Sequence, residues 1–161
     1  MRKTPWMVAA CFAATAGLAQ GEAGVRQQLA TDRATIQADR QAIVAEALPL
    51  TEEQAKAFWP LFREYRGEME KLGDRAVDLM IDYAKNMDVL TDEKAAALLD
   101  EYLKIQRDEV KVKQSWLPRF RKVLPGKTVT RFYQIESKLD TLLRFEAAAQ
   151  IPLVEDLNVK E

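Results

Sequence analysis

Apolar residues recur at alternating steps of four and three along one long segment, and this spacing limits what the segment can become. The residues are Phe58, Phe62, Tyr65, Met69, Leu72, Ala76, Leu79 and Tyr83. A helix gathers such residues into one row, as in the seam of a coiled coil, whereas a strand would scatter them over both faces. The spacing predicts one long helix that needs a partner surface.

Looser rows of the same period occur elsewhere. They consist of Leu98, Tyr102, Ile105, Val112 and Trp116, then of Phe132, Ile135, Leu139 and Leu142, and, near the amino terminus, of Val25, Leu29, Ile36 and Ile43. With breaks at Pro49, at 86–90 and at Pro125-Gly126, we expect helices over about 24–47, 52–87, 92–123 and 128–149. The expected fold is all-α, a long antiparallel helical hairpin with four helices that forms a curved dimer.

Two of these expected helices begin with matching residues 40 positions apart: Leu50-Thr51-Glu52-Glu53-Gln54 and Leu90-Thr91-Asp92-Glu93-Lys94. This offset is typical of repeated helical units. Thr51 and Thr91 are good N-caps, because the hydroxyl accepts a bond from a free backbone N–H. Gln54 can complete a capping box, whereas Lys94 cannot accept the same bond. Thr128 is a further candidate cap for the last helix.

Pro60 and Pro118 fall inside helical patterns, where each removes a backbone hydrogen bond and favours a bend. The bends suit either a concave surface that wraps a partner or the closure of a compact bundle.

Residues 1–19 have the pattern of a signal peptide. Arg2 and Lys3 precede an apolar run that is too short to span a bilayer as a helix, and Ala19 follows as a cleavage position. We expect a periplasmic protein without an integral membrane segment, with one helical domain over 20–150 and a tail over 151–161 that is either disordered or packed on a neighbour. Cleavage would remove Cys11, the only cysteine, and would change the net charge from −1 to −3.

The sequence contains no histidine. Most acid–base and nucleophilic catalysis at neutral pH depends on an imidazole, as do di-iron and haem sites in helical bundles. No glycine-rich phosphate loop is present either. We therefore expect a binding protein and not an enzyme, with no cofactor and no metal.

Seven basic residues and no acidic ones lie between Lys111 and Arg131, with aromatic residues among them. The candidate binding patch consists of Lys111, Lys113, Trp116, Arg119, Phe120, Arg121, Lys122, Lys127, Arg131 and Phe132. Either acids on the first two helices neutralise this patch within the fold, or it docks an anionic, partly apolar partner. For an exported protein, unfolded polypeptide or lipid phosphate fits this chemistry better than nucleic acid does.

The motif Leu50, Thr51 and Gln54, with its partial copy at Leu90 and Thr91, resembles the LTXXQ-motif family of small periplasmic helical proteins (the Spy/CpxP-like proteins) over roughly residues 45–145. The resemblance implies a curved helical homodimer that binds unfolded or stressed envelope proteins without ATP. It equally implies a regulatory or structural protein that docks one periplasmic partner, such as a stress-sensor domain. The motif itself is then a structural helix cap.

Overall fold

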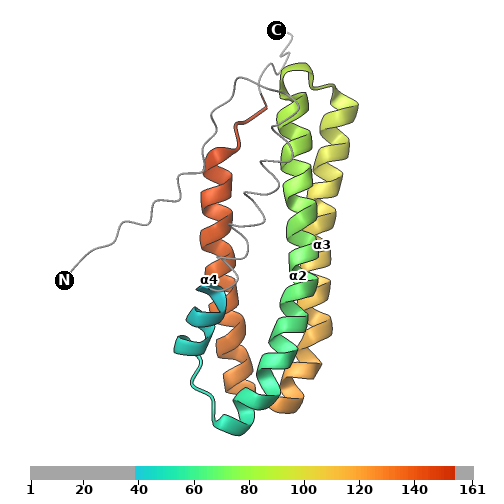
Figure 1. Cartoon of the computed structure of the whole chain (residues 1–161). Coiled ribbons are helices and arrows are strands. Elements are labelled where there is room, and N and C mark those ends of the chain that lie inside the picture. Colours follow the sequence, from blue (N-terminus) through green and yellow to red (C-terminus); the bar gives the residue numbers. More distant parts are fainter. Residues whose placement is uncertain (1–38, 155–161) are drawn as a thin grey trace, which may run out of the picture. The chain divides into compact units, whose positions relative to one another are not determined.

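The computed structural model describes residues 39–154, and these residues form helices joined by short connections (Figure 1). A short helix over 39–47 is followed by α2 (Glu52–Asn86), the 3₁₀ turn η1 (Met87–Val89), α3 (Asp92–Val123) and α4 (Gly126–Gln150). No strand occurs between residues 39 and 154, so the predicted all-α class is confirmed. The expected signal peptide and the start of the first helix lie outside the described residues, as does the tail beyond residue 154.

The expected helix boundaries agree closely with those of α2 and α3. The predicted start of the last helix was wrong, because α4 begins at Gly126 and not at residue 128. Pro125 takes the N-cap position, and its carbonyl accepts a bond from the amide of Val129 at 3.0 Å. Proline has no N–H and a fixed φ, so it initiates the helix without a side-chain bond, and Thr128 lies in the first turn.

Both predicted threonine caps are present. The Thr51 hydroxyl accepts from the Gln54 amide at 3.2 Å, and the Gln54 side chain accepts from the Thr51 amide at 3.1 Å, which completes a capping box. The Thr91 hydroxyl accepts from the Lys94 amide at 3.3 Å. The side chain of Lys94 instead donates to the Asp82 carboxylate at 2.7 Å, and so joins the two helices of the hairpin.

Helices α2 and α3 form the predicted antiparallel hairpin (Figure 1). Contacts across it pair residues in opposite order along the two helices. Arg75 of α2 donates to Glu101 of α3 at 2.7 Å, whereas Glu68, seven residues further from the turn, accepts from the indole N–H of Trp116 at 2.9 Å. Helix α4 runs back beside α3, which it contacts through Asp140 and Lys113 at 2.8 Å.

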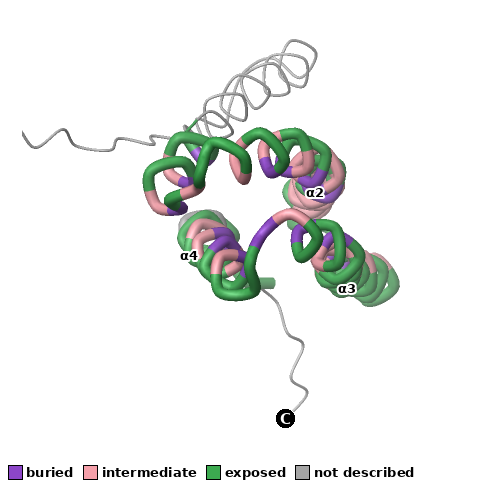
Figure 2. Tube along the Cα trace, turned by 90° about the horizontal axis from the view of Figure 1, so that it is seen from below, coloured by how far each residue is buried: buried purple, intermediate pink, exposed green. Residues whose placement is uncertain are grey.

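The hydrophobic core lies where the first half of α2, the last half of α3 and the first half of α4 meet. We call this cluster the aromatic core; its buried members are Val44, Leu48, Phe58, Phe62, Tyr65, Met69, Leu72, Trp116, Phe120, Leu124, Val129 and Phe132. The rings pack closely, with the centroid of Phe132 4.9 Å from that of Phe120 and 5.2 Å from that of Phe58. Figure 2 shows these buried stretches on the sides of the helices that face one another.

The opposite end of the hairpin, residues 73–107, is packed much more loosely, and we call it the hairpin tip. Within it the structure buries only Leu98 and Ile105. The large apolar residues of α2 beyond Gly73, such as Leu79 and Tyr83, remain half-buried. Because burial of apolar area is the main source of stability, most of the stabilisation of this unit comes from the aromatic core.

Candidate interaction surfaces

The three aromatic members of the predicted binding patch lie inside the protein. Trp116, Phe120 and Phe132 are all buried, and they form the centre of the aromatic core. Their helical spacing put them on the same side of α3 and α4 as the core-facing residues. The part of the predicted patch that a partner can reach therefore consists of its basic residues.

Several of these basic residues bond to other groups of the same chain. Lys113 pairs with Asp140 of α4 at 2.8 Å, and Lys111 pairs with Asp108 at 3.1 Å. The Arg131 guanidinium donates to the carbonyl of Ala47 at 2.6 Å, where it caps the end of the short first helix. A cation at a helix C-terminus is favourable because the last carbonyls carry partial negative charge.

The remaining cations cluster around the turn between α3 and α4. We call this group the basic turn; it consists of Arg119, Arg121, Lys122 and Lys127, all of which are exposed. Arg119 lies over the Trp116 ring, 4.2 Å from its centroid, in a cation–π contact. Arg119 is thus held on the aromatic core, and all four residues of the basic turn present positive charge to solvent.

An open groove of roughly 500 Å³ adjoins the basic turn between α3 and α4. Its lining includes Leu117, Val129 and Tyr133 together with Arg121, Thr130 and Gln134, and no acidic residue lines it. Burial raises the pKa of the Tyr133 hydroxyl to about 12, with the nearby Glu136 adding to the effect. That hydroxyl donates to the Lys113 carbonyl at 2.7 Å, so it is fixed on α3.

The motif residues have structural roles. Leu50 packs against the aromatic core, and Thr51 with Gln54 forms the cap described above. Thr91 caps α3, and Leu90 is half-buried at the turn. These five residues begin the two helices of the hairpin and do not join the basic turn.

Several large apolar residues of α3 and α4 are exposed. Tyr102 and Leu142 belong to the apolar rows identified in the sequence, yet the structure leaves both of them exposed. The sequence analysis did not name the other five, which are Leu99, Leu103 and Val110 on α3 and Leu143 and Phe145 on α4. Leu99, Leu103 and Val110 lie off the row that faces α2, and this displacement is the signal that could have identified them. Exposed apolar groups gathered on few elements are typical of interaction sites.

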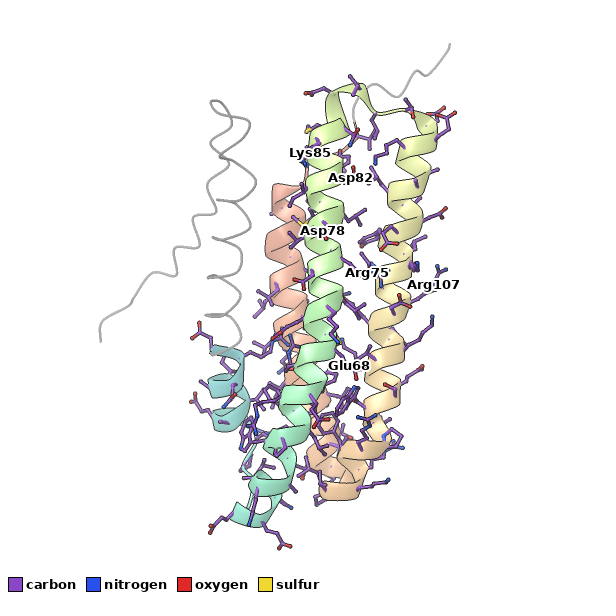
Figure 3. All side chains as sticks on the ribbon, turned by 45° about the vertical axis from the view of Figure 1, so that its right-hand side comes forward. Glu68, Arg75, Asp78, Asp82, Lys85 and Arg107 are labelled. Atoms are coloured by element: carbon purple, nitrogen blue, oxygen red, sulfur yellow. The ribbon has the colours of Figure 1, made fainter. Side chains whose placement is uncertain are left out.

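A second cavity, of about 350 Å³, lies between α2 and α3 at the hairpin tip and is lined mainly by charged residues. Arg75 extends from α2 towards α3 (Figure 3), where it bonds both Glu101 and Asp108. The Arg75 guanidinium, and secondarily Lys111, lowers the pKa of the Asp108 carboxyl. The hydrogen bonds to Asp108 and Glu101 in turn raise the pKa of Arg75. These paired charges join the two helices across a region with few buried apolar contacts.

Two polar groups lie within the aromatic core. Glu136 of α4 is buried and accepts a bond from Arg66 of α2 at 3.0 Å. The Tyr65 hydroxyl is buried and has no hydrogen-bond partner among residues 39–154. Burial, and secondarily the charge of Glu136, raises the pKa of that hydroxyl well above its usual value.

The described part of the chain contains no group of three or more Asp, Glu, His or Cys side chains placed to hold a metal ion. None of its helices combines the length and the apolar character needed to cross a bilayer. No family model matches the chain, and no curated protein or solved structure does so either.

Proposed function

We propose that this chain is an exported, ATP-independent chaperone-like protein that binds unfolded or stressed envelope proteins. One observation carries the proposal: large apolar side chains are exposed on α3 and α4, although the aromatic core is complete without them. An unfolded polypeptide exposes apolar groups of its own, and their burial against such residues favours binding. Export is supported by the signal-peptide pattern of residues 1–19, which lie outside the described structure.

The basic turn adds an electrostatic contribution to this binding. Four exposed cations on a rigid support attract acidic segments over several ångströms and speed the encounter. The apolar residues Leu142 and Phe145 lie far along α4 from that turn, so charge and apolar contact are supplied by different parts of the surface. This separation suits an extended, flexible partner better than a small compact one.

The test is light scattering of a chemically denatured, acidic model protein diluted into buffer with and without the purified protein. We expect aggregation to be suppressed near equimolar ratio without ATP. Substituting both Leu142→Lys and Phe145→Lys should raise the amount needed severalfold, whereas the control Ala57→Lys, which adds charge at an exposed small residue of α2, should not. Absence of suppression by the unaltered protein would contradict the proposal.

A separate experiment addresses the alternative of one dedicated partner. Pull-down from an envelope extract should recover many proteins in small amounts if the protein binds unfolded chains. Recovery of a single protein in fixed stoichiometry would instead indicate a regulatory or structural docking protein, and would contradict the chaperone proposal.

A further inference from the structure

The open groove beside the basic turn contains polar side chains that no other part of the described chain uses. We call it the α3–α4 groove; Arg121 lines it from α3, and Gln134 and Ser137 line it from α4. All three residues are exposed, and none of their side chains has a hydrogen bond or an ion pair within residues 39–154. A ligand can therefore bind these groups without breaking a contact of the fold.

The α3–α4 groove has fixed walls. On the side of the hairpin tip, Lys113 of α3 pairs with Asp140 of α4 at 2.8 Å, and the Lys113 carbonyl accepts from the Tyr133 hydroxyl at 2.7 Å. At the other end, the short turn at 124–125 joins the two helices directly. Because both ends are tied, the lining residues keep their spacing without a ligand, and a preformed site loses less free energy on binding.

The charge of the groove suits a negative ligand. No acidic residue lines it, and the guanidinium of Arg121 has no carboxylate partner among the described residues. The positive charge of Arg121 partly offsets the rise in the pKa of the Tyr133 hydroxyl, so Arg121 lies close to that side chain. A guanidinium can hold one carboxylate through two parallel hydrogen bonds.

An apolar floor lies next to this charge and consists of Leu117, Val129 and Tyr133. Leu117 and Arg121 are one helical turn apart, which is about 6 Å along α3. In an extended peptide, side chains two positions apart point to the same side and are separated by roughly 6.6 Å. An extended chain thus places an aliphatic side chain on Leu117 and a carboxylate at Arg121 without distortion.

The neutral polar residues of the groove distinguish a peptide from a lipid. Gln134 and Ser137 offer both donors and acceptors beside the apolar floor. The N–H and C=O groups of a peptide backbone can pair with them. The acyl chain of a lipid would instead cover these groups and leave them without partners, which is unfavourable.

We propose that the α3–α4 groove binds an extended polypeptide segment in which an aliphatic and an acidic residue are two positions apart. The proposal rests on the proposed function, because it takes a polypeptide as the ligand and names the kind of segment that is bound. The groove is lined by other residues than the exposed Leu142 and Phe145, so it adds a sequence preference to their unselective apolar contact.

The experiment is an NMR titration of the ¹⁵N-labelled full chain with a seven-residue peptide. The peptide is acetylated and amidated, and it carries one leucine and one aspartate two positions apart among glycines and serines. We expect the amide signals of Arg121, Gln134 and Ser137 to shift, and the Kd to rise at least fivefold when asparagine replaces the aspartate or alanine the leucine. A peptide with the two residues adjacent should also bind more weakly, because neighbouring side chains of an extended chain point to opposite sides.

Variants of the protein locate the bound carboxylate. Arg121→Glu should raise the Kd about tenfold, because it replaces an attractive contact by a repulsive one. The matched control Lys122→Glu makes the same change of charge on the next residue, which does not line the groove, and should raise the Kd less than threefold. Gln134→Glu is a second variant that places an acid in the groove and should weaken binding, with circular dichroism to show that each variant is folded.

Equal weakening by Arg121→Glu and Lys122→Glu overturns the proposal, since the attraction would then come from the overall charge of the basic turn. Equal binding of the aspartate and asparagine peptides also overturns it. Tighter binding of decanoate than of the peptide at the same residues does so too, because the groove would then be an acyl-chain site. Failure of the titration while the protein still suppresses aggregation removes this site alone, whereas peptide binding without suppression keeps the site and contradicts the chaperone proposal.

Discussion

The indole N–H of Trp116 in α3 donates to the carboxylate of Glu68 in α2 at 2.9 Å. The ring itself is buried among Tyr65 and Phe120, with centroids 6.1 Å from each. A buried indole usually requires a partner for its one polar atom, and Glu68 provides it at the edge of the aromatic core. This bond connects the two helices of the hairpin at the point where the core begins.

Removing the acceptor should destabilise the protein. Glu68→Ala leaves a buried N–H without a partner, so we expect the free energy of unfolding to fall by about 1–3 kcal/mol. Urea unfolding followed by circular dichroism measures the change, and the exposed Glu64→Ala on the same helix is the control, expected within about 0.5 kcal/mol of the unaltered protein. Equal effects of the two substitutions would show that the bond contributes nothing.

Replacing Tyr65 by phenylalanine should stabilise the protein. The Tyr65 hydroxyl is buried without a hydrogen-bond partner among the described residues, and leaving such a group unpaired costs about 1–3 kcal/mol. We expect Tyr65→Phe to raise the unfolding free energy by about 1 kcal/mol in urea titrations at neutral pH. Tyr133→Phe is the matched control and should destabilise, because it removes the bond to the Lys113 carbonyl. Destabilisation by Tyr65→Phe would contradict the assignment of an unpaired hydroxyl.

The two tyrosines also predict the response to alkaline pH. The pKa of Tyr133 is about 12 in the folded protein against 10.0 in an unperturbed tyrosine, and that of Tyr65 is raised further. A raised pKa means that the neutral form is favoured on folding, so its contribution to stability is complete below pH 10 and is lost as the pH rises above it. Urea midpoints measured from pH 8 to 11 should fall above pH 10, and less steeply in Tyr65→Phe.

The ion pairs of Arg75 predict the response to acid. The pKa of Asp108 is held below its ordinary value of 3.8, first by Arg75 and then by Lys111. A carboxyl whose pKa is lowered by folding adds to the unfolding free energy above pH 4. This contribution is lost as the pH falls through the pKa of the folded protein. Asp108→Asn should therefore weaken the acid dependence of the unfolding midpoint between pH 5 and 2, whereas the exposed Asp88→Asn should not.

The two helix starts should differ in their sensitivity to alanine. Thr51→Ala removes one bond of a complete capping box, and we expect a loss of about 1 kcal/mol. Thr91→Ala removes the only side-chain cap of α3, yet the hairpin tip is loosely packed, so the global unfolding free energy should change less while the tip opens more readily. Global urea unfolding and peptide-level proteolysis near residue 90 distinguish the two effects.

Much of this fold was predictable because it depends on the local spacing of apolar residues and on the residues that begin and end each helix. The row from Phe58 to Leu72 and the caps at Thr51 and Thr91 fix helix identity and start without reference to distant residues. The start of α4 was missed because proline can begin a helix with no side-chain bond, and Thr128 offered a more familiar cap. Lys94 seemed a defect in the repeat, yet its bond to Asp82 depends on a contact between helices that spacing does not reveal.

The candidate site was harder to predict, because the exposure of a side chain depends on which other helices pack against it. Sequence spacing placed Trp116, Phe120 and Phe132 beside the basic residues but could not tell a surface aromatic from a core one. Likewise, Leu99 and Leu103 look like ordinary helix residues until α2 and α4 are seen to leave them uncovered. The basic turn was predicted because its charges lie together in the chain.

The contrast between the aromatic core and the hairpin tip has a consequence for how the molecule moves. Amide protons near η1 should exchange with deuterium through small, frequent openings, while those of Phe62 and Phe120 should exchange only when the whole unit unfolds. We expect the last turns of α2 and the first turns of α3 to melt and re-form when a client engages them. The aromatic core would stay folded throughout, so that the helical length of the hairpin tip changes while its base keeps its position.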